Sequence, residues 1–216
     1  MIVRPRLAAA LAVAGLSLSG CASPGAPAAS GSSAGQAPAV VSGAAQKYAG
    51  VNLATPYRRP TFTLTDQAGK PFDFKPATGG IPTLLFFGYT QCPDVCPTTM
   101  ADIAVALRSV GKPLATRARV VFVTTDPAHD TPAVLAEYLH RFDADLPQKF
   151  IGLTGSQASI DAAQLSAGVP QAADGGKTHS ALLLLYGKDD AAHVAFDQGN
   201  TPRDIAADLK RVAAGA

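Results

Sequence analysis

The sequence lacks an excess of charge of either sign, a hydrophobic run long enough to span a membrane, and more than three cysteines. Its long apolar run, Leu7–Leu18, is shorter than the roughly 20 residues that a transmembrane helix needs. Removal of residues 1–20 takes away Arg4 and Arg6, which leaves 16 basic and 16 acidic residues and a formal net charge of zero. A surface without net positive charge does not attract nucleic acid, so nucleic acid is excluded as a partner. With so few cysteines, each one needs its own explanation.

The N-terminus has the pattern of an export signal. Arg4 and Arg6 form a positive segment, an apolar stretch follows, and residues 18–21 (LSGC) have the small side chains that precede a cleavage site. This pattern resembles a bacterial lipoprotein signal, in which Cys21 becomes the acylated first residue of the mature protein. A plain secretory peptide with an incidental cysteine is the alternative. Both place the folded part outside the cytoplasm, in an oxidising compartment. The lipid signal predicts a lipid-anchored protein of the bacterial cell envelope that faces the periplasm or extracytoplasmic space.

Composition divides the rest of the chain in two. Residues 21–50 are mostly Ala, Ser, Gly and Pro, with almost no charge, and they bury too little apolar surface to offset the entropy of ordering them. We therefore expect residues 1–20 to be a signal peptide and residues 21–50 to be an acylated N-terminus and flexible tether. Residues 51–216 have the size and the apolar content of one ordinary domain.

Hydrophobic periodicity and turn residues predict an α/β domain. A short hairpin is expected from residues 61–65 and 71–74, around a turn-type cluster. Strands are expected over 83–89, 118–124, 150–153, 180–186 and 193–196, and helices over 98–110, 131–142, 156–165 and from 201 onward. Strands and helices alternate through the middle, and a hairpin and a helix close the chain. This order predicts a thioredoxin-like fold, with a central mixed sheet flanked by helices and an N-terminal hairpin extension.

Two cysteines lie between an apolar strand and the helix that follows it. Cys92 and Cys96 are separated by three residues. The first turn of a helix has unpaired N–H groups and the positive end of the helix dipole, which lower the pKa of a thiol. Pro97 suits an early helical position because it has no N–H to leave unpaired. Cys96 lies about one turn beyond Cys92, so both sulfurs can face the same point and share a disulfide or a metal.

Two thiolates are an incomplete site for most metals, and one of the four histidines is well placed to add a ligand. His179 follows the glycine-rich residues 175–178 and directly precedes a buried strand. In a thioredoxin-like sheet this loop approaches the cysteine-bearing helix, at a position where oxidoreductases of the fold usually keep a proline. His140 near a helix end, His193 in a hairpin and His129 at a helix entry are interpreted as structural or solvated residues.

Four segments in the same order give the chain a resemblance to a known family. They are residues 88–97 (GYTQCPDVCP), 125–132 (TDPAHDTP), 150–155 (FIGLTG) and 179–180 (HS). The domain resembles the Sco/SenC family of copper chaperones, thioredoxin-like proteins with a lipid or membrane anchor that are linked to assembly of the dinuclear copper centre of cytochrome c oxidase. The resemblance implies that Cys92, Cys96 and His179 bind copper.

The ligand types agree with copper. Two soft thiolates suit Cu(I), and an added imidazole lets the site hold Cu(II) as well. A structural zinc site usually needs a fourth ligand, and none is evident. The chain departs from the family at Thr178, where many members have an acidic residue, and at His129, where many have arginine. Asp126 is a candidate for supporting a ligand without touching the metal, and equally a strand-end residue that shapes the following turn.

The expected activity is metal transfer without catalytic turnover, so no catalytic residue is assigned. Both sulfurs must be thiolates to bind metal, so a disulfide between Cys92 and Cys96 would be the metal-free form. A periplasmic thiol reductant must act first. The reduced protein would then take up copper and pass it by ligand exchange to cytochrome c oxidase subunit II or a similar acceptor.

Two other functions would use the same fold. One is a thiol–disulfide oxidoreductase acting on cysteines of oxidase subunit II or of other exported proteins. Such enzymes usually have two residues between their cysteines and a proline in place of His179. The other is a peroxide-reducing enzyme, which needs an arginine beside its cysteine. The nearest basic residue after the motif, Arg108, lies at the far end of the helix.

Overall fold

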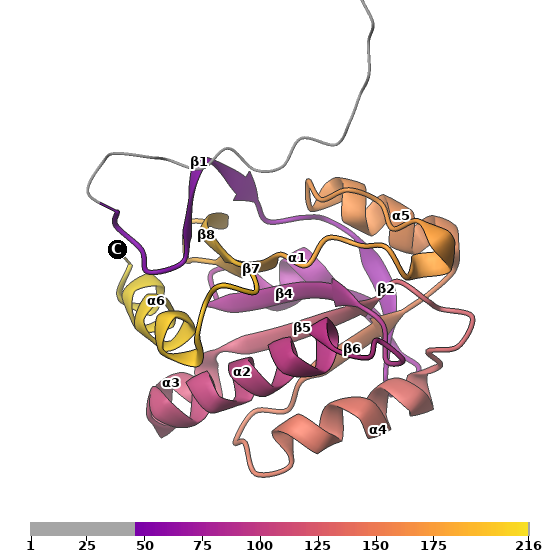
Figure 1. Cartoon of the computed structure of the whole chain (residues 1–216), viewed down its shortest axis with the longest axis horizontal. Coiled ribbons are helices and arrows are strands. Elements are labelled where there is room, and N and C mark those ends of the chain that lie inside the picture. Colours follow the sequence, from indigo (N-terminus) through magenta and orange to yellow (C-terminus); the bar gives the residue numbers. More distant parts are fainter. Residues whose placement is uncertain (1–45, 216) are drawn as a thin grey trace, which may run out of the picture. The chain divides into compact units, whose positions relative to one another are not determined.

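The computed structural model describes residues 46–215, which form a mixed eight-stranded β-sheet with helices on both faces (Figure 1). The predicted signal peptide, Cys21 and residues 21–45 of the predicted tether lie outside the described residues. The strands are β1 (Val51–Arg58), β2 (Thr63–Asp66), β3 (Pro71–Asp73), β4 (Thr83–Gly88), β5 (Arg119–Thr124), β6 (Ile151–Thr154), β7 (Leu183–Tyr186) and β8 (Ala191–Phe196). The helices are α1 (Phe74–Thr78), α2 (Val95–Ser109), α3 (Lys112–Arg117), α4 (Pro132–Asp143), α5 (Gln157–Ser166) and α6 (Pro202–Ala214), with a 3-10 turn η1 (Asp174–Gly176).

The sheet has a parallel centre and antiparallel edges. Its strand order is β1-β8-β7-β4-β5-β6-β2-β3. Strand β5 pairs in parallel with both β4 and β6, and the crossover connections carry α2 and α4. All other pairs are antiparallel, including the β2–β3 hairpin. This arrangement confirms the predicted thioredoxin-like fold with its hairpin extension.

The central strand β4 is buried on both faces of the sheet. Leu84 and Phe86 pack with residues of α2, α4 and α6, whereas Leu85 and Phe87 pack with residues of α1 and α5. This alternation follows from strand geometry, in which successive side chains point to opposite faces. Because the strand is covered on both faces, its last residue, Gly88, has a fixed position, and the turn into α2 starts from a rigid point.

Most elements lie within a few residues of their predicted ranges, and the differences have local causes. Helix α2 begins at Val95, three residues before the predicted start, so it includes Cys96. The sequence pattern predicts neither β1 nor the short helices α1 and α3. Strand β1 is an edge strand of mixed polarity, and its register with β8 is interrupted between Asn52 and Tyr57. Helix α3 begins directly after Gly111, a glycine that the periodicity indicates only as a helix end.

The first described residues are held against α6. The N–H groups of Ala49 and Gly50 donate to the two carboxylate oxygens of Asp208 at 3.0 and 2.8 Å. Asp208 is fully buried, and the Asn52 side chain donates to the Gly50 carbonyl at 3.0 Å. Ordered contacts therefore begin before Val51. Within residues 46–215, no helix has the length and apolar character needed to cross a membrane.

Candidate metal centre

The predicted metal ligands lie where β4 ends and α2 begins. The chain leaves β4 at Gly88 and turns through residues 89–94 into α2. A Cβ atom at Gly88 would lie 2.8 Å from Cys96 Sγ, so glycine is what lets the sulfur pack against the end of the strand. Parallel strands end at the same edge of the sheet, and the Thr125 N–H donates to the Gly88 carbonyl at 2.7 Å. The β5–α4 loop therefore lies beside the cysteine turn.

Cys92 lies at the N-terminus of α2, where its sulfur accepts a hydrogen bond from the Cys96 N–H at 3.4 Å. Both cysteines are free thiols, and Cys92 is half-buried. Burial by itself raises the pKa of the Cys92 thiol. Hydrogen bonds from the N–H groups of Cys96, Asp94 and Val95, and from the Cys96 thiol, outweigh burial and lower this pKa below its ordinary value. The helix start therefore stabilises a thiolate on Cys92, as the sequence predicts.

The pKa of the Cys96 thiol is shifted in the opposite direction. Burial strongly raises the pKa of the Cys96 thiol, and a backbone hydrogen bond at Tyr89 offsets only part of the rise. Negative charge on Cys92 and on Asp130 raises this pKa further. In the metal-free protein Cys96 is therefore a neutral thiol near pH 7. A cation bound between the two sulfurs would reverse this preference by stabilising the second thiolate.

His179 lies beside the buried cysteine, as predicted from its position in the chain. Its Nε2 atom is 3.7 Å from Cys96 Sγ, and its Nδ1 atom lies 3.0 Å from the Ser180 carbonyl oxygen. A carbonyl oxygen can only accept, so Nδ1 carries a proton, and in the Nδ1–H tautomer Nε2 is the nitrogen with a free lone pair beside the sulfur. The rings of Tyr89 and Phe86 meet the imidazole edge-on, at centroid distances of 5.7 and 6.1 Å. The imidazole is therefore held in one orientation.

The spacing of these donors fits a metal ion. With metal–sulfur and metal–nitrogen bonds of about 2.3 and 2.1 Å, a sulfur and a nitrogen 3.7 Å apart subtend an angle of roughly 115° at the metal. This angle suits trigonal or tetrahedral coordination. Cys96 contacts both Cys92 and His179. Within residues 46–215, however, no three Cys, His, Asp or Glu side chains already surround a common point as a complete site.

The loop that carries His179 is fixed by contacts that the sequence did not reveal. The Thr125 hydroxyl donates to the Gly176 carbonyl at 2.7 Å, and a Cβ atom at Gly176 would lie 2.0 Å from the Thr125 carbonyl oxygen. The Thr178 hydroxyl donates to the Asp174 carboxylate at 2.8 Å. Thr178, the residue before His179, is thus hydrogen-bonded to a carboxylate of the same loop. The glycine pair before His179 was the available signal for a close backbone approach.

Asp126 does not contact His179 through a hydrogen bond. Its carboxylate pairs with His129, whose Nδ1 lies 2.8 Å from Asp126 Oδ2. The Asp126 N–H also donates to the Thr124 hydroxyl at 3.0 Å, which fixes the turn after β5. His140 and His193 lie beside Asp143 and Asp189. These three histidines therefore pair with carboxylates, in agreement with their structural interpretation.

Asp130 is a buried residue of this region that the sequence did not single out. Its carboxylate accepts hydrogen bonds from the Thr90 N–H at 3.0 Å, the Thr90 hydroxyl at 2.6 Å and the Thr124 hydroxyl at 2.5 Å. These bonds connect the turn before Cys92 to the end of β5. Asp130 therefore fixes the cysteine turn and supplies negative charge close to Cys96.

Arg108 lies at the other end of α2 and is already paired. It donates to both carboxylate oxygens of Asp145, at 2.9 and 2.7 Å. A peroxide-reducing cysteine needs an arginine next to the sulfur, and this pairing gives that alternative no support.

Comparisons with known proteins agree with the fold and the motifs. The sequence model of the SCO1/SenC family matches residues 53–214. A SCO2-like protein of Rickettsia felis is 40% identical over 99 residues, which cover 46% of this chain and 45% of that protein. The solved structure of Bradyrhizobium japonicum ScoI with copper bound is 39% identical, with a TM-score of 0.58, and covers 73% of this chain and 98% of that chain. BsSco is 25% identical, with a TM-score of 0.57, and covers 77% of this chain and 97% of that chain.

The descriptions of the relatives mention bound copper and a disulfide switch. BsSco is described as a member of the Sco family of cytochrome c oxidase assembly proteins and has a disulfide switch. The chain spans less than two thirds of the length of the curated relatives it matches. The family match nevertheless covers most of the chain and nearly all of the described domain. The chain therefore belongs to the SCO1/SenC family.

Proposed function

We propose that this protein is an extracytoplasmic copper chaperone that binds copper through Cys92, Cys96 and His179. The contact of 3.7 Å between His179 Nε2 and Cys96 Sγ carries the proposal, because it brings an imidazole nitrogen beside one of the two thiols. Two thiolates and one imidazole are a donor set that suits Cu(I) and can also hold Cu(II). ScoI of Bradyrhizobium japonicum, with the same fold, holds copper.

Uptake begins at Cys92 and ends at His179. The lowered pKa of Cys92 provides a thiolate to meet the incoming ion, and the ion then favours loss of the proton from Cys96. The imidazole completes the site through Nε2, since Nδ1 donates to the Ser180 carbonyl. No chemical bond of a substrate is broken, so the protein acts as a carrier rather than as an enzyme.

The thiol pair must be reduced before it can bind copper. A disulfide between Cys92 and Cys96 would remove both thiolates, and its reduction requires two electrons and two protons from a thiol reductant of the periplasm. The disulfide switch of BsSco supports this order of events.

The proposed acceptor is the dinuclear copper site of cytochrome c oxidase, in subunit II or a similar protein. The description of BsSco as a cytochrome c oxidase assembly protein supports this assignment. The sequence adds a signal peptide over residues 1–20, an acylated Cys21 and a tether over residues 21–50, which would hold the domain of residues 51–216 at the surface of the cell envelope.

Single substitutions test the ligand set. Cys92→Ser, Cys96→Ser and His179→Ala should each abolish tight one-to-one copper binding by the reduced protein, measured by competition with a chelator. His193→Ala is the matched control, since His193 pairs with Asp189 in the β7–β8 hairpin. If His179→Ala holds copper as tightly as the wild type does, the three-ligand site is wrong.

A thiol–disulfide oxidoreductase acting on oxidase subunit II or other exported proteins is the second candidate. The opposite pKa shifts of Cys92 and Cys96 favour it, because a reductase needs one nucleophilic thiolate and one protected thiol. The test is turnover of a mixed-disulfide substrate without metal. A carrier should show little turnover, and it should show a thiolate-to-copper charge-transfer band when loaded with Cu(II).

A further inference from the structure

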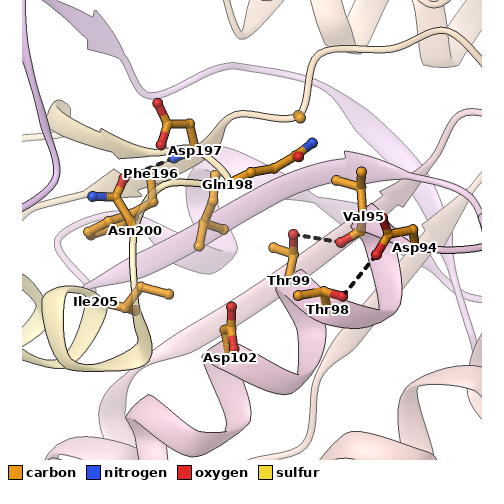
Figure 2. A pocket seen from close by; sticks show the side chains of 12 residues that line it. Asp94, Val95, Thr98, Thr99, Asp102, Phe196, Asp197, Gln198, Asn200 and Ile205 are labelled. Carbon is orange, nitrogen blue, oxygen red and sulfur yellow. Dashed lines mark hydrogen bonds between the residues drawn. The ribbon is translucent and has the colours of Figure 1, made fainter.

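A groove lies along the first turns of α2. One wall is formed by Asp94, the residue before α2, and by the face of α2 that carries Thr98 and Asp102. The opposite wall is the start of β7 and the turn between β8 and α6, including Asp197 (Figure 2). Its volume is about 170 Å³, enough for one or two side chains of a bound segment. We call this feature, lined by residues of these three segments, the α2 groove.

The α2 groove has an apolar floor and an acidic rim. Val95, Leu183, Phe196 and Ile205 contribute apolar surface to its lining. Figure 2 shows the carboxylates of Asp94, just before α2, and of Asp102, on α2, and that of Asp197 on the turn across from them. Among the described residues that line it, none is Lys or Arg. The surface therefore complements a segment with an apolar side chain and a positive charge.

Asp102 is the carboxylate of this rim that lacks a partner. Asp94 accepts from the Thr98 hydroxyl at 3.5 Å, and Asp197 accepts from the Gly199 N–H at 2.8 Å. Asp102 is half-buried and makes no hydrogen bond or ion pair with any residue in the 46–215 region. Burial raises the pKa of Asp102, and no donor or cation offsets the loss of water. A carboxylate in this state gains more from an incoming cation than a fully hydrated one does.

The residues that line the α2 groove include sequence neighbours of the proposed copper ligands, although not the ligands themselves. Asp94 lies between the two cysteines in the sequence, and Ala181, on the opposite wall, is two residues beyond His179. A segment lying in the groove would bring its neighbouring residues against Cys92 and His179. Ligand exchange requires this proximity, because the acceptor's donors must reach the ion before the carrier's donors leave.

We propose that the α2 groove is the docking site for a segment of the copper acceptor, with an apolar side chain on the floor and a Lys or Arg side chain on Asp102. This inference rests on the proposed delivery function. The chain's own residues 21–45 contain neither Lys nor Arg and do not offer the complementary charge.

The test compares copper transfer by charge variants of Asp102. Full-length wild type, Asp102→Asn and Asp102→Lys are compared at equal copper loading, with the soluble copper domain of cytochrome c oxidase subunit II as the acceptor. Glu137→Gln, which neutralises an exposed carboxylate on α4, is the matched control. At low ionic strength the transfer rate constant should fall several-fold in Asp102→Asn and more than about ten-fold in Asp102→Lys. Transfer by the wild type should slow with added salt, and transfer by Asp102→Asn should depend on salt less steeply.

The outcomes separate this inference from the proposed function. If the wild type binds no copper, or delivers none to the oxidase domain, the proposed delivery function is wrong. The proposed docking site is then wrong as well. If the wild type delivers copper and Asp102→Lys does so at the same rate, only the docking site is wrong. If sedimentation shows that the wild type self-associates and Asp102→Lys does not, the occupant is a second copy of the chain, which also overturns the proposal. Amide NMR shifts at Thr98 and Gln198 on addition of the oxidase domain would support it.

Discussion

Cys92 and Cys96 are one helical turn apart, yet the protein shifts the pKa values of their thiols in opposite directions. N–H groups at the start of α2 stabilise a thiolate on Cys92, whereas burial and nearby negative charge keep Cys96 neutral. The difference arises from the extent of burial, since Cys92 is half-buried and Cys96 packs against Gly88 in the core. A thiolate therefore forms more easily at Cys92 than at Cys96 in the metal-free protein, and a bound cation would favour a second thiolate on Cys96.

This difference predicts selective alkylation of the reduced, metal-free protein. Because the pKa of Cys92 is lowered, its thiolate fraction at neutral pH exceeds that of an ordinary thiol, and its reaction rate with iodoacetamide should level off at a lower pH. Cys96 should react much more slowly throughout this range, since its pKa is raised and its sulfur is buried. Mass spectrometry of peptides after timed reaction measures both rates. In denaturant the two rates should become similar, and equal rates in the folded protein would contradict the assignment.

The sequence indicates the three proposed donor residues but not the residues that position them. The spacing of the cysteines, the glycine-rich loop and the family motifs all point to Cys92, Cys96 and His179. Asp130 and Thr125 belong to the motif of residues 125–132, but their contacts are with Thr90 and Gly176, which are far away in the sequence. Such long-range pairs have no local signature, so only the fold reveals them.

At the scale of elements, the loop before β7 illustrates how a glycine determines the position of a ligand. Gly176 has a φ of 91° and touches the Thr125 backbone, whereas Gly175 has a φ of 66° and no atom near the position of its missing Cβ. Both glycines adopt the left-handed conformation, but only one makes a close contact. Substitutions at the two glycines can therefore distinguish the free-energy cost of a positive φ from the effect of crowding the Thr125 backbone.

Alanine substitutions at these two glycines should have different effects. Gly175→Ala should destabilise the fold by about 1 kcal/mol, from the positive φ alone, and leave copper affinity unchanged. Gly176→Ala should displace the His179 loop from Thr125 and weaken copper binding by about 10- to 100-fold. Thermal unfolding and chelator competition measure the two effects. Similar affinities for the two variants would show that this contact does not position the ligand.

The elements themselves follow the sequence where local signals are strong. Helices α4, α5 and α6 begin at the N-cap residues Thr131, Ser156 and Thr201, each of which accepts a backbone N–H. Strand β1 was missed because an edge strand needs no continuous apolar run. Helix α2 was placed too late because its first turn, around Cys96 and Pro97, resembles a loop in composition.

At the scale of the whole molecule, a buried arginine holds together the end of the sheet opposite the metal centre. The Arg59 side chain has 0% exposure and pairs with Asp190 at 2.8 Å. It also donates to the hydroxyls of Thr78 and Thr83 and to the Gly187 carbonyl. These bonds join the segment after β1 to α1, to the start of β4 and to the β7–β8 hairpin. The metal centre lies at the other end of β4.

Arg59→Met should therefore destabilise the protein without altering the metal site. Removal of the guanidinium leaves the buried Gly187 carbonyl without this donor, so the free energy of unfolding should fall by about 1–3 kcal/mol. Copper affinity of the folded variant should equal that of the wild type. Arg108→Met removes an exposed ion pair with Asp145 and should cost less than about 1 kcal/mol. Urea denaturation of both variants measures the difference, and equal losses would contradict this role for Arg59.

The clamp between Asp208 and the backbone of Ala49 and Gly50 determines how the domain responds to force. Tension on the chain before Gln46 reaches α6 through two amide–carboxylate bonds before it reaches the edge of the sheet. Without these bonds, the same force would peel β1 from β8 one hydrogen bond at a time. The domain can therefore bear tension at its amino end while strand β1 stays paired with β8.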